Sequence, residues 1–212
     1  PRQVRSAVVF DQIAQPPVPD SDRQTIDRLQ GLWRARPLFR RSTFPYGPGS
    51  VEVELPPFAL TEGEITVWQW RECSRNAASG CVDPADRYAE AGLPPPADPD
   101  PVRLIAWAEA DAFCRWAFQD DRLPEGYVGR LPTDAEWERT ARGRIPPGRR
   151  FPHGRSFDPA TLETVSAPAL PPGRSDPDDR NVATVHDLVG SVQEWVLDPA
   201  PADARPGEDR RA

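Results

Sequence analysis

The chain has 212 residues, enough to bury a hydrophobic core without help from a metal or a disulfide. Its 28 prolines and 14 glycines, with 38 % hydrophobic residues, predict a loop-rich fold. The formal charge is −7 and the 26 basic residues, all arginine, are scattered among the acids, which argues against a nucleic-acid partner. No apolar run approaches the roughly 20 residues of a membrane-spanning helix, so no transmembrane segment is expected.

Residues 1–48 are predicted to form an N-terminal extension or linker with one helix. A proline-rich break covers 16–19, apolar side chains at helical spacing favour a helix over 20–36, and a turn cluster follows at 45–49. The sequence contains no methionine, which we interpret as loss of the natural N-terminus. The absence of a signal peptide is therefore uninformative.

The folded domain is predicted to begin at residue 49. Alternation of Val51, Val53 and Leu55 with glutamates indicates a half-buried strand. A short helix is expected over 68–73.

A loop and a second helix are predicted next along the chain. The stretch 83–101 is rich in proline, alanine and aspartate and is expected to be loop. The helix is expected over 107–118. Its inward face is predicted to carry Ala106, Ala110, Phe113, Cys114 and Ala117.

A third helix, over 133–142, is marked by a capping box. Thr133 is a candidate N-cap, and Glu136 stands three residues later, where its side chain can return to the cap. Asp134 adds a negative charge that suits the positive end of a helix. The apolar positions of this otherwise charged helix are Ala135, Trp137 and Ala141.

The string Gly-Arg-Leu-Pro-Thr-Asp-Ala-Glu-Trp-Glu-Arg-Thr-Ala-Arg at 129–142 closely resembles a signature of the formylglycine-generating enzyme (sulfatase-modifying factor) family. Two further blocks support the resemblance. Residues 64–70 resemble the family's Glu-Val-Thr start of its first helix, although alone they would suit any strand-to-helix junction. Residues 101–116 resemble its Pro-Val…Trp…Asp-Ala…Phe-Cys-x-Trp helix.

The resemblance implies an α+β, C-type-lectin-like fold with few regular elements and a small antiparallel sheet. It covers about 51–198, so we expect a family domain over 49–198 that is C-terminally incomplete. Residues 199–212 are proline, alanine and charged side chains, which predict a disordered tail.

The resemblance also implies a calcium site, because 187–196 is similar to the family's Gly-Asn-Val-Trp-Glu-Trp segment. Asp187 and Glu194 would supply side-chain oxygens, and Gly190 and Val192 backbone carbonyls, which are the hard ligands that calcium prefers. The sequence departs from the family beside these ligands, at Ser191 and Gln193. The alternative is a strand with a tight turn and no metal.

The three cysteines have different expected roles. Cys73 and Cys81 bracket a glycine-containing loop, and some bacterial members of the family carry a similar pair after the first helix, so a disulfide is expected. A metal site is the weaker alternative, because His153 and His186 are remote. A disulfide implies an oxidising, extracytoplasmic compartment, periplasmic or secreted. Cys114, on an apolar helix face, is predicted to be a buried, inert thiol.

In the family, some members oxidise a sulfatase cysteine with a copper-binding cysteine pair, others are iron-dependent sulfoxide synthases, and others have no demonstrated catalysis. No copper or iron site is recognisable in this sequence, and His153 and His186 are expected to be ordinary loop residues. Whether the chain is an enzyme stays open. The favoured hypothesis is a non-catalytic binding or accessory module, a pseudoenzyme, for an unknown protein or small-molecule ligand. The alternative is the N-terminal part of a true oxidoreductase whose catalytic segment is missing.

Overall fold

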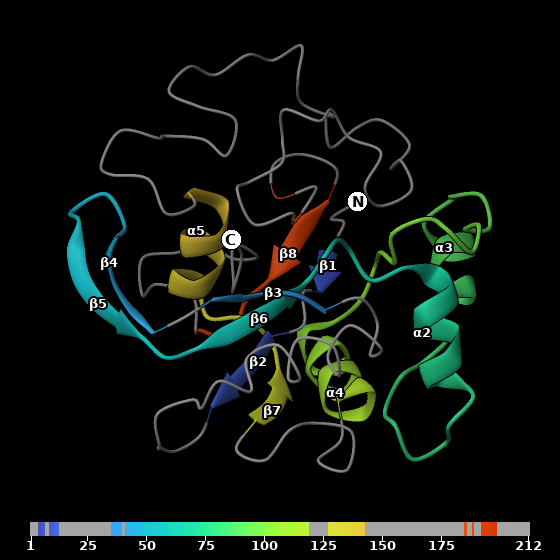
Figure 1. Ribbon diagram of the computed structural model, residues 1–212. Coiled ribbons are helices and arrows are strands. Elements are labelled where there is room, and N and C mark those ends of the chain that lie inside the picture. The colour runs from blue at the N-terminus through green and yellow to red at the C-terminus, as the bar shows by residue number, and fades with distance from the viewer. Residues whose placement is uncertain are drawn as a thin grey trace.

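The computed structural model combines short helices with small, mostly antiparallel sheets and many loops, which is an α+β architecture (Figure 1). It describes residues 4–6, 9–12, 35–39, 41–118, 127–142, 185, 188 and 192–198. Across these residues, no helix is long and apolar enough to cross a membrane.

A four-stranded antiparallel sheet lies at the centre. Its strand order is β3 (Ala35–Phe39), β6 (Phe58–Thr61), β2 (Val9–Gln12) and β7 (Tyr127–Arg130). All four residues of β6 are buried, as expected for an inner strand covered on both faces. This sheet is the surface on which the helices pack.

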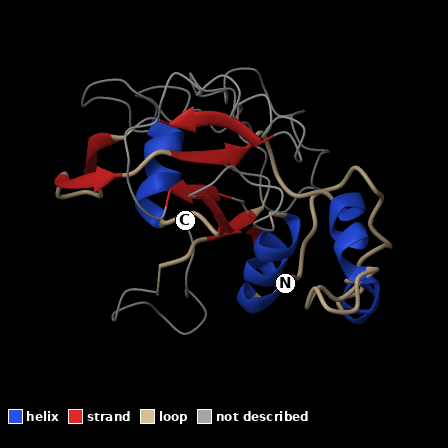
Figure 2. Ribbon diagram, turned by 60° about the horizontal axis from the view of Figure 1, so that its bottom comes forward, coloured by secondary structure: helices blue, strands red, loops and turns tan. Residues whose placement is uncertain are grey.

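A hairpin of β4 (Ser42–Tyr46) and β5 (Val51–Leu55) extends to one side of the sheet, with α5 (Asp134–Arg142) beside it (Figure 2). The turn places Gly47 at φ +69°, a conformation that favours glycine, and its carbonyl accepts the Ser50 N–H at 3.0 Å. The expected half-buried strand is present. Its alternation fails at Val51, which is 62 % exposed because it borders the turn.

Strand β1 (Val4–Ser6) pairs in parallel with β8 (Gln193–Trp195), which joins two distant parts of the chain. Strands β2, β3 and β4 also lie within residues 1–48, for which an N-terminal extension or linker with one helix was expected. The sequences of these four strands (VRS, VFDQ, ARPLF and STFPY) lack the sustained apolar–polar alternation that revealed β5, so the sequence pattern did not predict them.

Most of the helix expected over 20–36 lies outside the described residues, and its last two positions belong to β3. The tail expected over 199–212 also lies outside them.

The first expected helix is present as α2 (Val67–Ser74), and a capping box starts it. The Gln69 N–H donates to Oγ1 of Thr66 at 3.2 Å, and the Thr66 N–H donates back to Oε1 of Gln69 at 2.8 Å. Trp70 is fully buried and its Nε1–H donates to the carbonyl of Val82 at 2.8 Å. Local capping and one large buried side chain thus fix this helix.

The stretch expected to be loop contains a helix, α3 (Ala85–Glu90). The Asp83 carboxylate accepts the Ala85 N–H at 3.0 Å, and Tyr88 is only 1 % exposed. One buried tyrosine therefore anchors a helix too short for periodicity to reveal.

The second expected helix is α4 (Trp107–Ala117), and its inward face is largely as predicted. Ala106 is exposed, because it is the N-cap and has extended backbone angles. Asp111, which was not predicted, is buried. The third is α5 (Asp134–Arg142), which packs against the hairpin.

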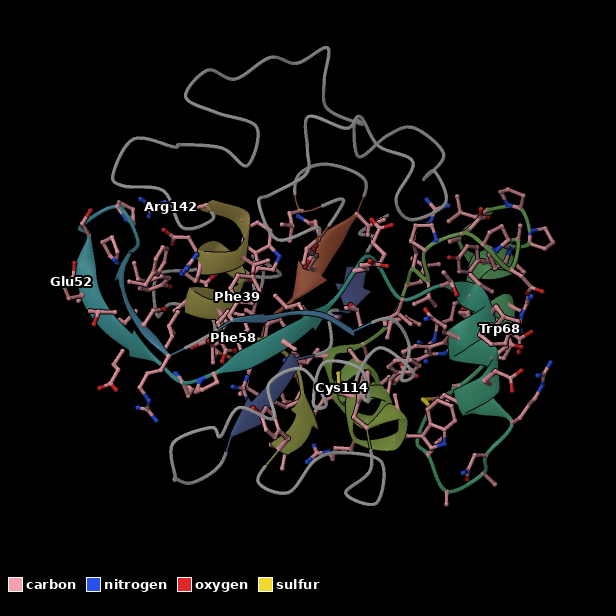
Figure 3. All side chains as sticks on the ribbon, viewed as in Figure 1. Phe39, Glu52, Phe58, Trp68, Cys114 and Arg142 are labelled. Atoms are coloured by element: carbon pink, nitrogen blue, oxygen red, sulfur yellow. A yellow bond between two sulfur atoms is a disulfide. The ribbon has the colours of Figure 1, made fainter. Side chains whose placement is uncertain are left out.

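Two apolar clusters form the core. One lies around α2, α4 and β7, with Trp70 stacked on Phe113 at 5.3 Å between ring centroids. The other lies between the sheet and α5, where Phe39 stacks on Phe58 at 4.5 Å (Figure 3). The first cluster thus holds α4, and the second holds α5, against the central strands.

Helix α4 and strand β7 approach so closely at Gly129 that a side chain has no room. A Cβ there would lie 2.4 Å from the Cβ of Phe118 and 2.7 Å from the Cys114 carbonyl oxygen. We therefore expect Gly129→Ala to lower the free energy of unfolding by about 1–3 kcal/mol, measured by urea denaturation. Gly49→Ala is the matched control, since its only neighbour within 4 Å is at 3.9 Å, and it should change stability little. Equal effects of the two substitutions would contradict this packing.

Candidate functional site

The segment 192–198 contains the described part of the expected calcium loop. Glu194, in β8, is only 4 % exposed, and its Oε2 accepts the Nε1–H of Trp137 at 2.5 Å. Val192, two residues earlier, is equally buried at 4 %. The other two expected ligands, Asp187 and Gly190, lie outside the described residues.

Two more indoles fix this segment to the start of α4. The Nε1–H of Trp107 donates to the Val196 carbonyl at 2.8 Å. In return, the Nε1–H of Trp195 donates to the Ile105 carbonyl at 2.9 Å. Because each indole donates to a backbone carbonyl of the other segment, the two segments are held in one register.

The end of the segment docks at the start of α5. The Leu197 N–H donates to the Pro132 carbonyl at 2.7 Å, and the Asp198 carboxylate accepts the Asp134 N–H at 2.6 Å. A carboxylate in this place satisfies a free helical N–H and complements the positive end of the helix. The start of α5 is therefore the platform on which the segment rests.

Asp134 lies in an acidic, partly buried setting on that platform. Burial raises the pKa of its carboxyl above the usual range, and the nearby Asp198 and Glu138 carboxylates raise it further. The Tyr46 hydroxyl donates to Asp134 Oδ2 at 2.5 Å, which acts in the opposite direction. The same hydrogen bond is the main cause that raises the pKa of Tyr46. The contact also ties the hairpin to α5.

Glu136 is the central group of the platform. Its carboxylate accepts from both terminal nitrogens of Arg130, at 2.7 and 2.9 Å, and from the Thr133 N–H at 2.7 Å. The Thr133 hydroxyl accepts the Glu136 N–H at 3.2 Å, which completes the expected capping box. The Glu136 side chain is 2 % exposed and that of Arg130 is 15 % exposed. One buried carboxylate thus joins β7 to the start of α5.

The sequence predicted the capping box but missed the ion pair. Of the expected apolar positions of α5, Ala141 is buried, and Ala135 and Trp137 are partly buried against the core. The helix also buries three polar side chains that were not expected, those of Glu136, Arg139 and Thr140. Arg139 lies with its guanidinium 5.6 Å from the ring centre of Phe39. The ion pair could have been anticipated from Arg130, a basic residue in the same signature string as Glu136.

The cysteines occupy the expected states. Cys73 and Cys81 form a disulfide, with their Cα atoms 5.8 Å apart. Cys114 is fully buried on the face of α4 toward the sheet, and this burial raises the pKa of its thiol far above the usual range (Figure 3). Because the sequence holds three cysteines and two of them are bonded, no pair of free thiols is left. His153 and His186 lie outside the described residues.

A buried carboxylate such as Glu194 has the chemistry of a calcium ligand. One of its oxygens accepts from Trp137, but each carboxylate oxygen can accept more than one contact. In the part of the chain that the structure describes, no three acidic, histidine or cysteine side chains are grouped around a metal position. The described part of this site therefore places one buried carboxylate, that of Glu194, against α5.

Comparison with known proteins finds a family model, FGE-sulfatase (sulfatase-modifying factor enzyme 1-like domain), that matches residues 39–208. The chain is 32 % identical over 120 residues to inactive C-alpha-formylglycine-generating enzyme 2 of Mus musculus, covering 50 % of this chain and 35 % of that protein. It is 30 % identical over 118 residues to formylglycine-generating enzyme of Streptomyces coelicolor, covering 46 % and 32 %. It is 29 % identical over 104 residues to hercynine oxygenase of Mycolicibacterium thermoresistibile, covering 47 % and 21 %. The match thus spans about a third or less of each relative.

The thiol states give a direct test by alkylation with iodoacetamide and mass spectrometry. We expect no label on the native protein, one label in urea, on Cys114, and three labels in urea with reductant. A Cys114→Ser variant is the control and should lose the label that urea alone exposes. Labelling of Cys73 or Cys81 without reductant would contradict the disulfide.

Proposed function

Because the chain belongs to the sulfatase-modifying factor enzyme 1-like domain family, we propose that it acts as a non-catalytic binding or accessory module. The observation that carries this proposal is the state of its cysteines. A relative named as an inactive formylglycine-generating enzyme supports it. The same membership supports a C-type-lectin-like arrangement of the α+β fold.

The chemistry of the oxidising members, as the family resemblance implies it, needs two thiolates that bind copper and engage the substrate thiol. Cys73 and Cys81 are bonded to each other, and Cys114 has no exposed surface. Since the thiolate is the metal ligand and nucleophile, a buried thiol with a raised pKa suits neither role. The cysteines of residues 1–212 therefore favour a scaffold without this chemistry.

The alternative is that the chain is the N-terminal part of a family oxidoreductase. The relatives that favour it include an enzyme named formylglycine-generating enzyme, of which the match spans 32 %. Under this alternative, the catalytic segment of the present protein would lie beyond residue 212. An Arg-Gly-Gly-Ser-Trp segment and a cysteine pair in the reading frame after Ala212 would establish this alternative.

Calcium is the cofactor that we propose, with Asp187, Gly190, Val192 and Glu194 as its ligands. Support comes from the burial of Glu194 and from the indole and backbone contacts that hold its segment in place. When bound, the ion would brace the loop that leads into β8. No catalytic role is assigned to it.

The compartment that we propose is extracytoplasmic, in a bacterium. The Cys73–Cys81 disulfide supports it, because such bonds persist mainly in oxidising environments. The proposed partner is an unknown protein or small molecule.

A calcium ion that binds only the folded state should raise the melting temperature. At 100 times its dissociation constant it would stabilise by about 2.7 kcal/mol, which corresponds to roughly 5–10 °C for a chain of this size. We expect this shift between calcium and chelator, and its loss in Glu194→Gln. Glu54→Gln is the control, since Glu54 is 67 % exposed on the hairpin and should leave the shift intact. Melts that do not respond to calcium, or an Asp187→Ala variant with the full response, would argue for a turn without metal.

The module hypothesis predicts no oxidation of a sulfatase cysteine. The chain is incubated with copper, reductant, oxygen and a Cys-x-Pro-x-Arg peptide, and formylglycine is sought by mass. We expect none, while the Streptomyces coelicolor formylglycine-generating enzyme serves as the positive control. Turnover by this chain that Cys114→Ser abolishes would overturn both the burial of that thiol and the non-catalytic assignment.

A further inference from the structure

A pocket of about 270 Å³ lies between the disulfide loop and the outer face of α4. None of its lining residues belongs to the segment 192–198. One wall is the loop, and the other is a single stripe of the helix at spacings of three and four residues. The lining residues are Asn76, Ala78, Ser79, Ala112, Arg115 and Trp116.

The loop wall is rigid because the loop satisfies its own polar groups. The Ser79 hydroxyl donates to the Cys73 carbonyl at 2.8 Å and accepts the Cys81 N–H at 3.1 Å. The Asn76 side-chain oxygen accepts the Ala78 N–H at 3.0 Å. With the disulfide across its base, this wall is formed before any ligand arrives, which lowers the entropy cost of binding.

The helix wall combines an aromatic ring with a cation. Trp116 packs on Phe113 with 5.8 Å between ring centroids, so the core supports its ring. Arg115 is 72 % exposed and pairs with the carboxylate of Asp111, which is only 7 % exposed. The buried carboxylate orients the guanidinium, whose planar fork has five N–H donors and therefore keeps donors for a second anion.

We propose that this pocket binds a small organic carboxylate with a flat apolar body. The carboxylate pairs with Arg115, and the apolar body lies against Trp116 and the methyl group of Ala78. Cations are repelled by the guanidinium, and neutral molecules lack the charge-assisted hydrogen bonds that favour the anion. The proposal is independent of the accessory role, since it holds equally for a domain of an enzyme.

Phenylacetate is the probe, and its binding to the full chain is followed by amide and indole NMR shifts. With its ~10 non-hydrogen atoms it should bind with a Kd on the order of 5 mM. We expect saturable shifts at Trp116, Ser79 and Ala112. Phenethylamine, which has the opposite charge on a similar body, should leave these signals in place.

Two variants separate the charge from the shape of the pocket. Arg115→Gln should weaken phenylacetate binding by about tenfold or more, because a charge-assisted pair is lost. Ala78→Leu should abolish binding by filling the pocket. Arg41→Gln is the control, since Arg41 is also exposed and ion-paired but lies next to the hairpin, and it should bind normally. Unchanged binding in Arg115→Gln, equal binding of phenethylamine, or shifts confined to other residues would overturn the proposal.

Discussion

The buried Glu136 carboxylate is the constraint on which this structure depends. It accepts both arms of the Arg130 guanidinium and the Thr133 N–H, so it closes the helix cap and the strand-to-helix junction at once. Removing one partner of such a pair leaves a buried charge without compensation, which typically costs roughly 3–5 kcal/mol. A glutamate that would be ordinary in an isolated capping box therefore becomes a structural centre in this fold.

The platform that Glu136 fixes carries the candidate site. The Pro132 carbonyl, just before α5, accepts the Leu197 N–H. Within α5, the Asp134 N–H donates to Asp198 and the Trp137 indole donates to Glu194. The burial of Glu194 is thus a consequence of where α5 begins. This links the family signature to a proposed calcium site some sixty residues later. A scaffold of this kind is compatible with many functions. The proposal of a non-catalytic module therefore rests on the states of the cysteines and not on the fold.

The features that could be predicted from the sequence are those set by residues close together in the chain. The capping box at Thr133 located α5, and the disulfide followed from spacing and family resemblance. The helix expected over 68–73 is α2, whose own capping box was found only in the structure. Strands β2 and β3 were missed, because their stability comes from pairing with β6 and not from their own few residues. At the site, Glu194 was expected from the resemblance, whereas its partner Trp137 was assigned only to an apolar position. Long-range hydrogen bonds of indoles have no sequence spacing from which they could be predicted.

The most direct test of the central claim is amide and indole hydrogen exchange in a Glu136→Gln variant. If the carboxylate supports the platform, the Leu197 amide and the Trp137 indole should lose protection, while the Trp70 indole, bonded within the α2 region, keeps its own. Retained protection at Leu197 and Trp137 would show that the segment 192–198 is held independently of Glu136. That result would contradict the role assigned to this carboxylate.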